Sequence, residues 1–232
     1  MRKGLGRAAI LALAGMALAV GIASAGPITP GFTFAVASSS NHVTGTHYHS
    51  NTGGAFGNPA GKAEVGAFSA EEVRGLSEYN LLGLATGPAF VTFNVFRDGG
   101  LFTGTNDFPF TGRIEVYAYQ GNNLEDISDY QAASVGSVGS FLTSGLAVGN
   151  TLSFDISTVY ANALANSWTS LGIRLERVDI DPPTLSGAWT FDTFRLTSTD
   201  DTNTVPDPGS SLLLLSIGLV GAVRAARRNR RG

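Results

Sequence analysis

The chain has 232 residues and no Cys, with 15 Lys and Arg against 18 Asp and Glu and a net charge of −3. Without Cys, this sequence excludes disulfides, thiolate metal sites and thiol nucleophiles. Residues 26–204 carry 7 cations against 17 acids, because the other cations lie near the two ends. This acidic balance argues against a nucleic-acid partner, which would require a basic face to displace counterions from the phosphates.

Residues 1–25 have the three parts of a secretory signal peptide. Three cations within residues 1–7 precede an uncharged apolar run over 8–22, and the small residues Ala23 and Ala25 follow. Signal peptidase requires small residues at these positions, so we expect export by the general secretion machinery and cleavage by signal peptidase after Ala25. The apolar run is shorter than the roughly 20 residues that cross a bilayer, which leaves a retained N-terminal anchor as the less favoured alternative.

Residues 26–204 are long enough to form one domain around one hydrophobic core. Several runs within them are rich in β-branched and aromatic residues and are bounded by Gly, Asn, Asp or Pro, which predicts strands. The predicted strands are residues 32–37, 72–79, 89–96, 113–119, 151–156, 171–178 and 189–197. The strand over 89–96 is apolar on both faces, which predicts a central position. The strand over 113–119 alternates between apolar and polar residues, which predicts one exposed face.

A single helix is predicted over residues 157–167, with Ser157 or Asp155 as its cap. The residues at helical spacing are Val159, Tyr160, Ala163 and Leu164. Residues 38–59 are rich in Ser, Asn, Thr and Gly, which predicts a loop-rich arm. We therefore expect an all-β fold, a two-sheet β-sandwich of jelly-roll-like type with one short helix. A signal peptide and a C-terminal membrane-sorting helix are expected to flank it.

The segment Thr-Leu-Ser-Phe-Asp-Ile-Ser at 151–157 precedes this helix, and Ser-Leu-Gly-Ile-Arg-Leu-Glu at 170–176 follows it. This order is similar to the closing part of jelly-roll modules that bind carbohydrate. The resemblance carries no sugar-contacting positions, so it supports the fold more than the function.

His47 and His49 lie two residues apart in the predicted arm. In an extended segment their side chains share one face about 6 to 7 Å apart, a spacing that suits two imidazoles on one transition metal. No carboxylate lies nearby in the sequence, so a set of solvated loop histidines is the favoured interpretation.

The turn over residues 121–129 is rich in the oxygen ligands that calcium prefers. Its candidate ligands for a structural calcium ion are Asn122, Asn123, Glu125, Asp126 and Asp129. The spacing differs from that of the twelve-residue helix-loop-helix calcium loop. The alternative is a turn in which Asn and Asp bond their own backbone, and no cofactor is required.

No catalytic residue is predicted. A Gly-x-Ser-x-Gly nucleophile motif is absent from the sequence, and nothing selects a carboxylate pair for glycoside cleavage among Glu71, Glu72, Glu78 and Glu115. Large aromatic residues could stack on sugars or fill the core. These residues are Trp168, Trp189, Tyr117, Tyr119, Tyr130 and Tyr160.

Residues 205–232 form a tripartite segment. It begins with Val205, Pro206, Asp207 and Pro208, continues with an apolar run over 210–223, and ends in arginines. The prolines favour an extended segment, and the apolar run can enter a membrane as a helix. The arginines remain on the cytoplasmic side and stop transfer. They are Arg224, Arg227, Arg228, Arg230 and Arg231.

This order of segments resembles the C-terminal sorting signal of PEP-CTERM proteins, whose usual form is Pro-Glu-Pro, an apolar helix and a basic end. Asp207 stands where that family usually has Glu. The resemblance implies export by a Gram-negative bacterium and recognition by an exosortase-like membrane protease. It also implies cleavage near the Pro-Asp-Pro segment after transient anchoring in the inner membrane. An ordinary single-span C-terminal anchor is the alternative.

The sequence as a whole predicts an exported protein of the cell surface or exopolysaccharide matrix. Its expected role is structural or adhesive, with carbohydrate binding as the candidate mode and exopolysaccharide as the candidate partner. We expect the chain to be a substrate of the sorting protease rather than an enzyme. The alternative is a secreted glycan-active enzyme with an unrecognised carboxylate pair.

Overall fold

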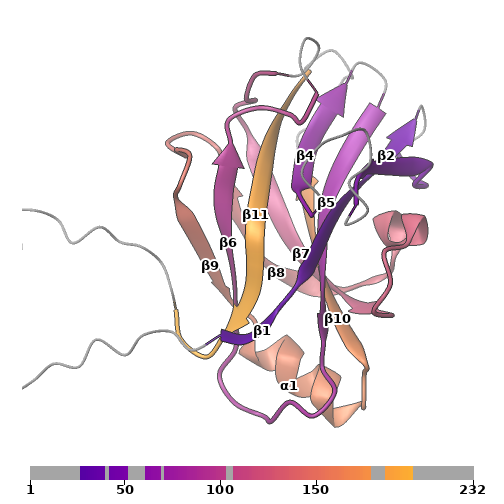
Figure 1. Cartoon of the computed structure of the whole chain (residues 1–232), viewed down its shortest axis with the longest axis vertical. Helices are drawn as coiled ribbons and strands as arrows, with labels where there is room; N and C mark the ends of the chain where they lie inside the picture. Colours follow the sequence, from indigo (N-terminus) through magenta and orange to yellow (C-terminus); the bar gives the residue numbers. More distant parts are fainter. Residues whose placement is uncertain are drawn as a thin grey trace, which may run out of the picture.

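The computed structural model describes residues 27–39, 42–51, 61–68, 71–102, 107–178 and 186–200. This part of the chain is mostly β-structure arranged as a nearly closed antiparallel sheet, with one α-helix (Figure 1). The predicted signal peptide over 1–25 and the sorting signal over 205–232 lie outside the described residues.

Eleven strands build the sheet. Their bounds are β1 Pro27–Pro30, β2 Phe32–Ser39, β3 His47–Ser50, β4 Ala63–Phe68, β5 Glu71–Asn80, β6 Phe90–Arg97, β7 Arg113–Gly121, β8 Ser134–Leu142, β9 Thr151–Asp155, β10 Ser170–Arg177 and β11 Gly187–Thr197. The seven predicted strands correspond to β2, β5, β6, β7, β9, β10 and β11. Four strands had no prediction, and one of them, β3, lies within the stretch expected to be a loop-rich arm.

The strand order is β8-β7-β10-β5-β4-β11-β6-β9, and β5 is the point at which the sheet divides into two arms. One edge of β5 pairs with β2, over the whole of β2 and residues 71–78 of β5. On the other edge, residues 75–80 pair with β10 and residues 71–73 pair with β4. This exchange of partners along one strand gives two arms, with β10, β7 and β8 in one and β4, β11, β6 and β9 in the other.

The main hydrophobic core lies between the two arms. Ile114, Val116 and Ala118 of β7 face inward, as their alternation predicts, and each is fully buried. Phe93 of β6 stacks on Phe194 with ring centroids 4.6 Å apart. Burial of such rings supplies much of the stability of a domain without disulfides.

The outermost strands of the two arms, β8 and β9, approach each other without pairing. Phe154 of β9 fills this seam, because a Cβ atom added to Gly139 of β8 would lie 2.9 Å from its ring. Its ring lies 5.9 Å from those of Phe93 and Phe141. Side-chain packing rather than backbone hydrogen bonding therefore closes the sheet at this seam.

The predicted helix is present as α1, Ser157–Ala165. Tyr160 and Ala163 are buried. The N-cap is Ile156 rather than the predicted Ser157 or Asp155, although the Asp155 carboxylate accepts a hydrogen bond of 2.8 Å from the Ser157 amide. Among the described residues, no helix has the length and apolar character needed to span a membrane.

The first and last described strands meet beside α1. Pro27 of β1 pairs with Thr197 of β11, so both ends of the described chain leave from the same end of the domain (Figure 1). Loops that join the strands form the opposite end.

Candidate functional site

The loop between β7 and β8 covers the outer face of β2, β5, β10 and β7. It contains a short 3₁₀ helix, η2, Ile127–Gln131. Arg174 of β10 donates hydrogen bonds to the carbonyl oxygens of Asp129 and Ala132, at 3.1 and 2.7 Å. Arg74 of β5 donates to the Tyr130 carbonyl oxygen at 2.8 Å. Two arginines of the sheet thereby fix the position of this loop.

An open pocket of about 400 Å³ lies where this loop meets the start of β2. Phe32 of β2 lines it, together with Asn123, Leu124 and Glu125 of the loop. The lining therefore combines an aromatic ring, an aliphatic side chain, an amide and a carboxylate. The Tyr48 hydroxyl of β3 donates a hydrogen bond to the Glu125 carbonyl oxygen, which attaches this side of the loop to the sheet.

The fully buried carboxylate of Glu78 lies beneath the turn that carries Asn123. It accepts hydrogen bonds from the backbone amides of Asn122 and Asn123, at 3.0 and 2.7 Å, and from the Ser170 hydroxyl at 2.8 Å. A Cβ atom at Gly121 would lie 2.5 Å from this carboxylate, so glycine is required for the close approach. Asn123 has a φ of 64°, which Asn tolerates better than most residues.

Two carboxyl groups near this turn have raised pKa values. Burial raises the pKa of Glu78, against the opposing effect of the hydrogen bonds from Ser170, Asn123 and Asn122. Burial, and after it the charge of Glu78, raises the pKa of Asp129 to about 7. Perturbed carboxyl groups of this kind gather at functional sites and also occur in structural networks.

Three buried polar atoms in this region have no hydrogen-bond partner. They are Oε1 of Glu78, the hydroxyl of Tyr119 and Oδ1 of Asn123, counted within the described residues and by strict hydrogen-bond geometry. The Tyr119 hydroxyl and the Glu78 carboxyl group nevertheless interact with each other. Buried polar groups usually have partners, so these atoms mark a place where water or a ligand atom would be stabilised.

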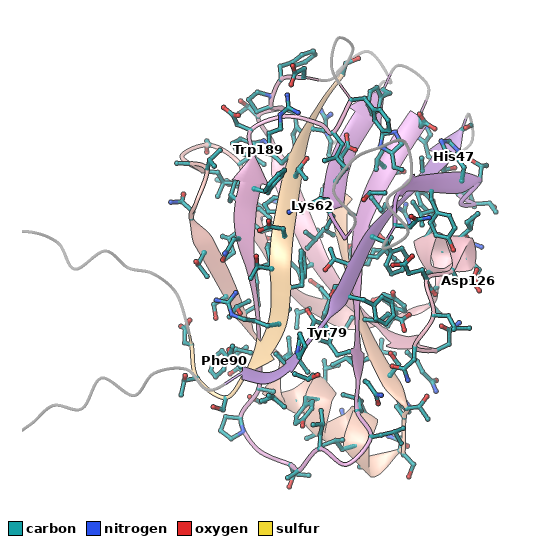
Figure 2. All side chains as sticks on the ribbon, in the orientation of Figure 1. His47, Lys62, Tyr79, Phe90, Asp126 and Trp189 are labelled. Atoms are coloured by element: carbon teal, nitrogen blue, oxygen red, sulfur yellow. The ribbon has the colours of Figure 1, made fainter. Side chains whose placement is uncertain are left out.

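The five residues predicted as calcium ligands lie in this loop, and Figure 2 shows Asp126 beside the helical turn. Oδ1 of Asn122 accepts a hydrogen bond from the Leu124 amide at 2.8 Å. Asp126 accepts from the Ser128 amide, and Asp129 accepts from the Asp126 amide, which forms a reciprocal capping box around η2. Across the six described ranges, no three His, Asp or Glu side chains are grouped to hold a metal ion. Calcium binding stays a prediction.

His47 and His49 share one face, as predicted, with ring centroids 6.2 Å apart. The structure adds the carboxylates that the local sequence lacks. Nε2 of His47 lies 3.0 Å from Oε1 of Glu71, and Nδ1 of His49 lies 2.6 Å from Oε2 of Glu64. Glu64 and Glu71 come from β4 and β5, so strand pairing alone brings them to the histidines, and sequence spacing gives no signal of it.

The aromatic residues considered for sugar stacking do not gather on one surface. Tyr119, Tyr130 and Tyr160 are fully buried, and the Trp189 indole donates to the Phe110 carbonyl oxygen at 2.9 Å. Trp168 is half-buried and packs against the main core. The ring in the pocket is instead that of Phe32, and its place at the start of a strand carried no sequence signal for this role.

The four acids considered for catalysis are dispersed over the sheet. Glu71 pairs with His47, and Glu115 accepts a hydrogen bond from the Ser137 hydroxyl. Glu72 bonds Arg74, while Glu78 bonds the turn described above. The residues of the predicted sorting motif, the terminal arginines, Ala23 and Ala25 lie outside the described residues.

A comparison with protein-family models finds no match for this chain, and a comparison with curated proteins finds none either.

Proposed function

We propose that the chain is an exported structural or adhesive protein that binds carbohydrate in the pocket formed by Phe32, Asn123, Leu124 and Glu125. The observation that carries this proposal is the lining of the pocket. A pyranose has an apolar C–H face and hydroxyl groups at its rim. The Phe32 ring suits the first, while the Asn123 amide and the Glu125 carboxylate suit the second.

The charge of the loop selects among sugars. Glu125 lines the pocket, and Asp126 and Asp129 follow in the same loop. These acids disfavour an anionic polysaccharide unless a cation such as calcium bridges the two, so a neutral glycan is the expected ligand.

Display on the cell surface rests on the sequence at the two ends. The PEP-CTERM-like segment over 205–232 would anchor the chain until an exosortase-like protease cleaves it. We also propose that the nearly closed sheet is a two-sheet sandwich of jelly-roll type.

Retention in affinity gels that contain hydroxyethylcellulose or alginate tests the binding proposal. We expect Phe32→Ala and Glu125→Gln to weaken retention about tenfold, equivalent to about 1.4 kcal/mol. Asn123→Gly tolerates the positive φ and removes the amide, including its hydrogen bond of 3.0 Å to the Thr169 carbonyl oxygen. Tyr117→Ala and Glu115→Gln are matched controls from β7 outside the pocket. Equal retention of the pocket variants and the control variants would reject the pocket as the carbohydrate-binding site. Retention on alginate that survives a chelator would reject calcium bridging.

The intact mass of the protein from its own cells tests the export proposal. We expect the mature protein to lack residues 1–25 and the residues beyond about 205, and to leave the membrane fraction. A membrane-bound protein that retains Arg231 would instead be a permanently anchored one.

One observation favours a glycan-active enzyme as a second candidate. Glu78 and Asp129 are two neighbouring carboxyl groups with raised pKa values, and glycoside cleavage uses a carboxyl pair. An enzyme would release reducing ends from the bound glycan, and Glu78→Gln or Asp129→Asn would abolish that release. Asp129→Asn keeps an acceptor for the Asp126 amide and should leave retention intact. Release that persists in both variants would reject this pair.

A further inference from the structure

The end of the domain that carries α1 has an unusual composition. The β5–β6 loop belongs to a stretch, residues 81–96, that contains no Asp, Glu, Lys or Arg, and residues 156–173, which include α1, contain none either. The two stretches pack together at this end (Figure 1). The Tyr160 hydroxyl donates to the Ala85 carbonyl oxygen at 2.9 Å, and the Leu81 amide donates to the Thr169 carbonyl oxygen at 3.0 Å.

This uncharged end presents apolar side chains to its surroundings. Leu82 is 70% exposed, while Leu84, Leu164 and Trp168 are half-buried, with one side packed against the main core. The exposed residues between them are Ala, Gly, Pro, Thr, Ser and Asn. Leucine with tryptophan among small uncharged residues is the composition of a surface that contacts the polar boundary of a bilayer.

The chain outside the described residues leads from this same end towards an apolar segment. The pairing of Pro27 with Thr197 places both ends of the described chain here, and the last described residue is Asp200. The apolar run over 210–223 begins ten residues later. Ten residues span at most about 35 Å in any conformation. Once that run is in a membrane, this end of the domain is held close to the bilayer.

The distribution of charge also favours this end as the one that contacts lipid. Residues 26–204 carry 7 cations against 17 acids, so most faces of the domain are repelled by anionic lipid headgroups. The opposite end carries ion pairs, such as that of Arg97 with Asp107, whose desolvation is costly. The exposed Asp155 and Asp200 also lie at the α1 end, next to α1 and after β11. No charged residue lies within residues 81–96 or 156–173, so the surface of these two stretches can approach lipid without stripping water from charged groups of its own.

We propose that, in the anchored chain, the surface formed by Leu82, Leu84, α1 and Trp168 docks on the lipid bilayer. The docked domain then has a fixed orientation, with the loops at its opposite end directed away from the membrane. This proposal rests on the anchoring step of the proposed function.

The absence of Cys allows the contact to be measured in the full chain. Spin labels are placed singly through Leu82→Cys and, as the matched control, Val148→Cys. Val148 is 58% exposed and lies in the β8–β9 loop at the opposite end. The labelled chains are reconstituted in phosphatidylcholine vesicles and floated on a density gradient. We expect the label at 82 to be more accessible to oxygen, and less accessible to a water-soluble nickel complex, than the label at 148.

A second measurement needs no label at Leu82. Lipids brominated in the acyl chain should quench the tryptophan fluorescence of the floated chain, and Trp168→Phe should abolish the quenching because the other tryptophan, Trp189, is 4% exposed. Chains that float with both labels equally open to the nickel complex, or with quenching unchanged by Trp168→Phe, would reject docking while leaving anchoring intact. Chains that do not float would reject anchoring and docking together.

Discussion

The hydroxyl of Tyr130 donates a hydrogen bond of 2.7 Å to Oε2 of Glu72, and this bond joins the η2 turn to the sheet beneath it. Arg74 completes the arrangement, because its Nε donates to Oε1 of Glu72 at 2.9 Å and its guanidinium lies 4.0 Å from the centre of the Tyr130 ring. Tyr130 and Glu72 are both buried, so each polar group depends on the others for its hydrogen bonds. The position of the pocket loop follows from this network.

Replacing Tyr130 with Phe should therefore destabilise the domain. The ring remains over Arg74, but Oε2 of Glu72 loses its hydroxyl donor in a buried site, at a cost of about 1 to 3 kcal/mol. Urea unfolding of the purified protein measures this difference. Tyr117→Phe, at a half-buried tyrosine of the same sheet face, should change the free energy of unfolding by less than about 0.5 kcal/mol. Equal effects of the two variants would contradict the role given to Tyr130.

The sequence predicted the strands whose residues alternate or whose apolar residues are continuous, because those patterns record burial directly. Residues 113–119 are the clearest case, with Ile114, Val116 and Ala118 all buried. Strand β8 escaped prediction because its sequence, SVGSVGSFL, is rich in Ser and Gly, which have low strand propensity. It becomes a strand through pairing with β7 and through Phe154 packing against Gly139.

Part of the candidate site could likewise be predicted from the sequence, and part of it could not. The oxygen-rich turn was visible in the sequence because Asn122, Asn123 and Asp126 are close together along the chain. Phe32 and Glu78 were not visible as its partners. The pairing of β2 with β5 brings these two residues together, and the pairing of β10 with both β5 and β7 brings them beside a turn that lies more than forty residues away. No spacing rule within one segment records a contact of that kind.

Gly172 should tolerate no side chain. A Cβ atom there would overlap the ring of Tyr119, which is fully buried and cannot move aside without disturbing the η2 loop. We expect Gly172→Ala to lower the free energy of unfolding by about 1 to 3 kcal/mol, because the added methyl group overpacks the site. Gly136→Ala is the matched control, because the space around Gly136 is open. Thermal unfolding of both variants measures the difference, and a Gly172→Ala protein as stable as the control would refute the close packing.

The buried pair of His49 and Glu64 should behave as a unit. Replacing His49 with Phe keeps an aromatic ring against Phe68 and Phe102, 5.0 and 4.6 Å away, but removes the hydrogen bond to a fully buried carboxylate. We expect His49→Phe to lower the free energy of unfolding by about 3 to 5 kcal/mol. The double variant His49→Phe, Glu64→Met should recover much of this loss, because it removes the buried carboxyl group as well. Additive losses in a denaturant-based double-mutant cycle would show that the pair is not coupled.

The raised pKa values of Glu78 and Asp129 predict how stability depends on pH. The pKa of Asp129 rises from 3.8 to about 7, chiefly by burial, and that of Glu78 is also raised by burial. Between these ordinary and raised values, the folded state binds more protons than the unfolded state. The free energy of unfolding therefore falls as pH rises through about 7, and the full contribution is present only below the ordinary values near 4.

We accordingly expect the domain to be more stable at pH 5 than at pH 8, by about 1 to 2 kcal/mol after allowance for partial solvent screening of Asp129. Asp129→Asn should flatten this dependence, because the amide oxygen can still accept the hydrogen bond from the Asp126 backbone while the titrating group is gone. Asp155→Asn is a suitable control, since the exposed Asp155 has a lowered pKa and titrates outside this range. Urea midpoints measured at both pH values decide the matter: a slope that persists in Asp129→Asn would assign the pH dependence to other groups.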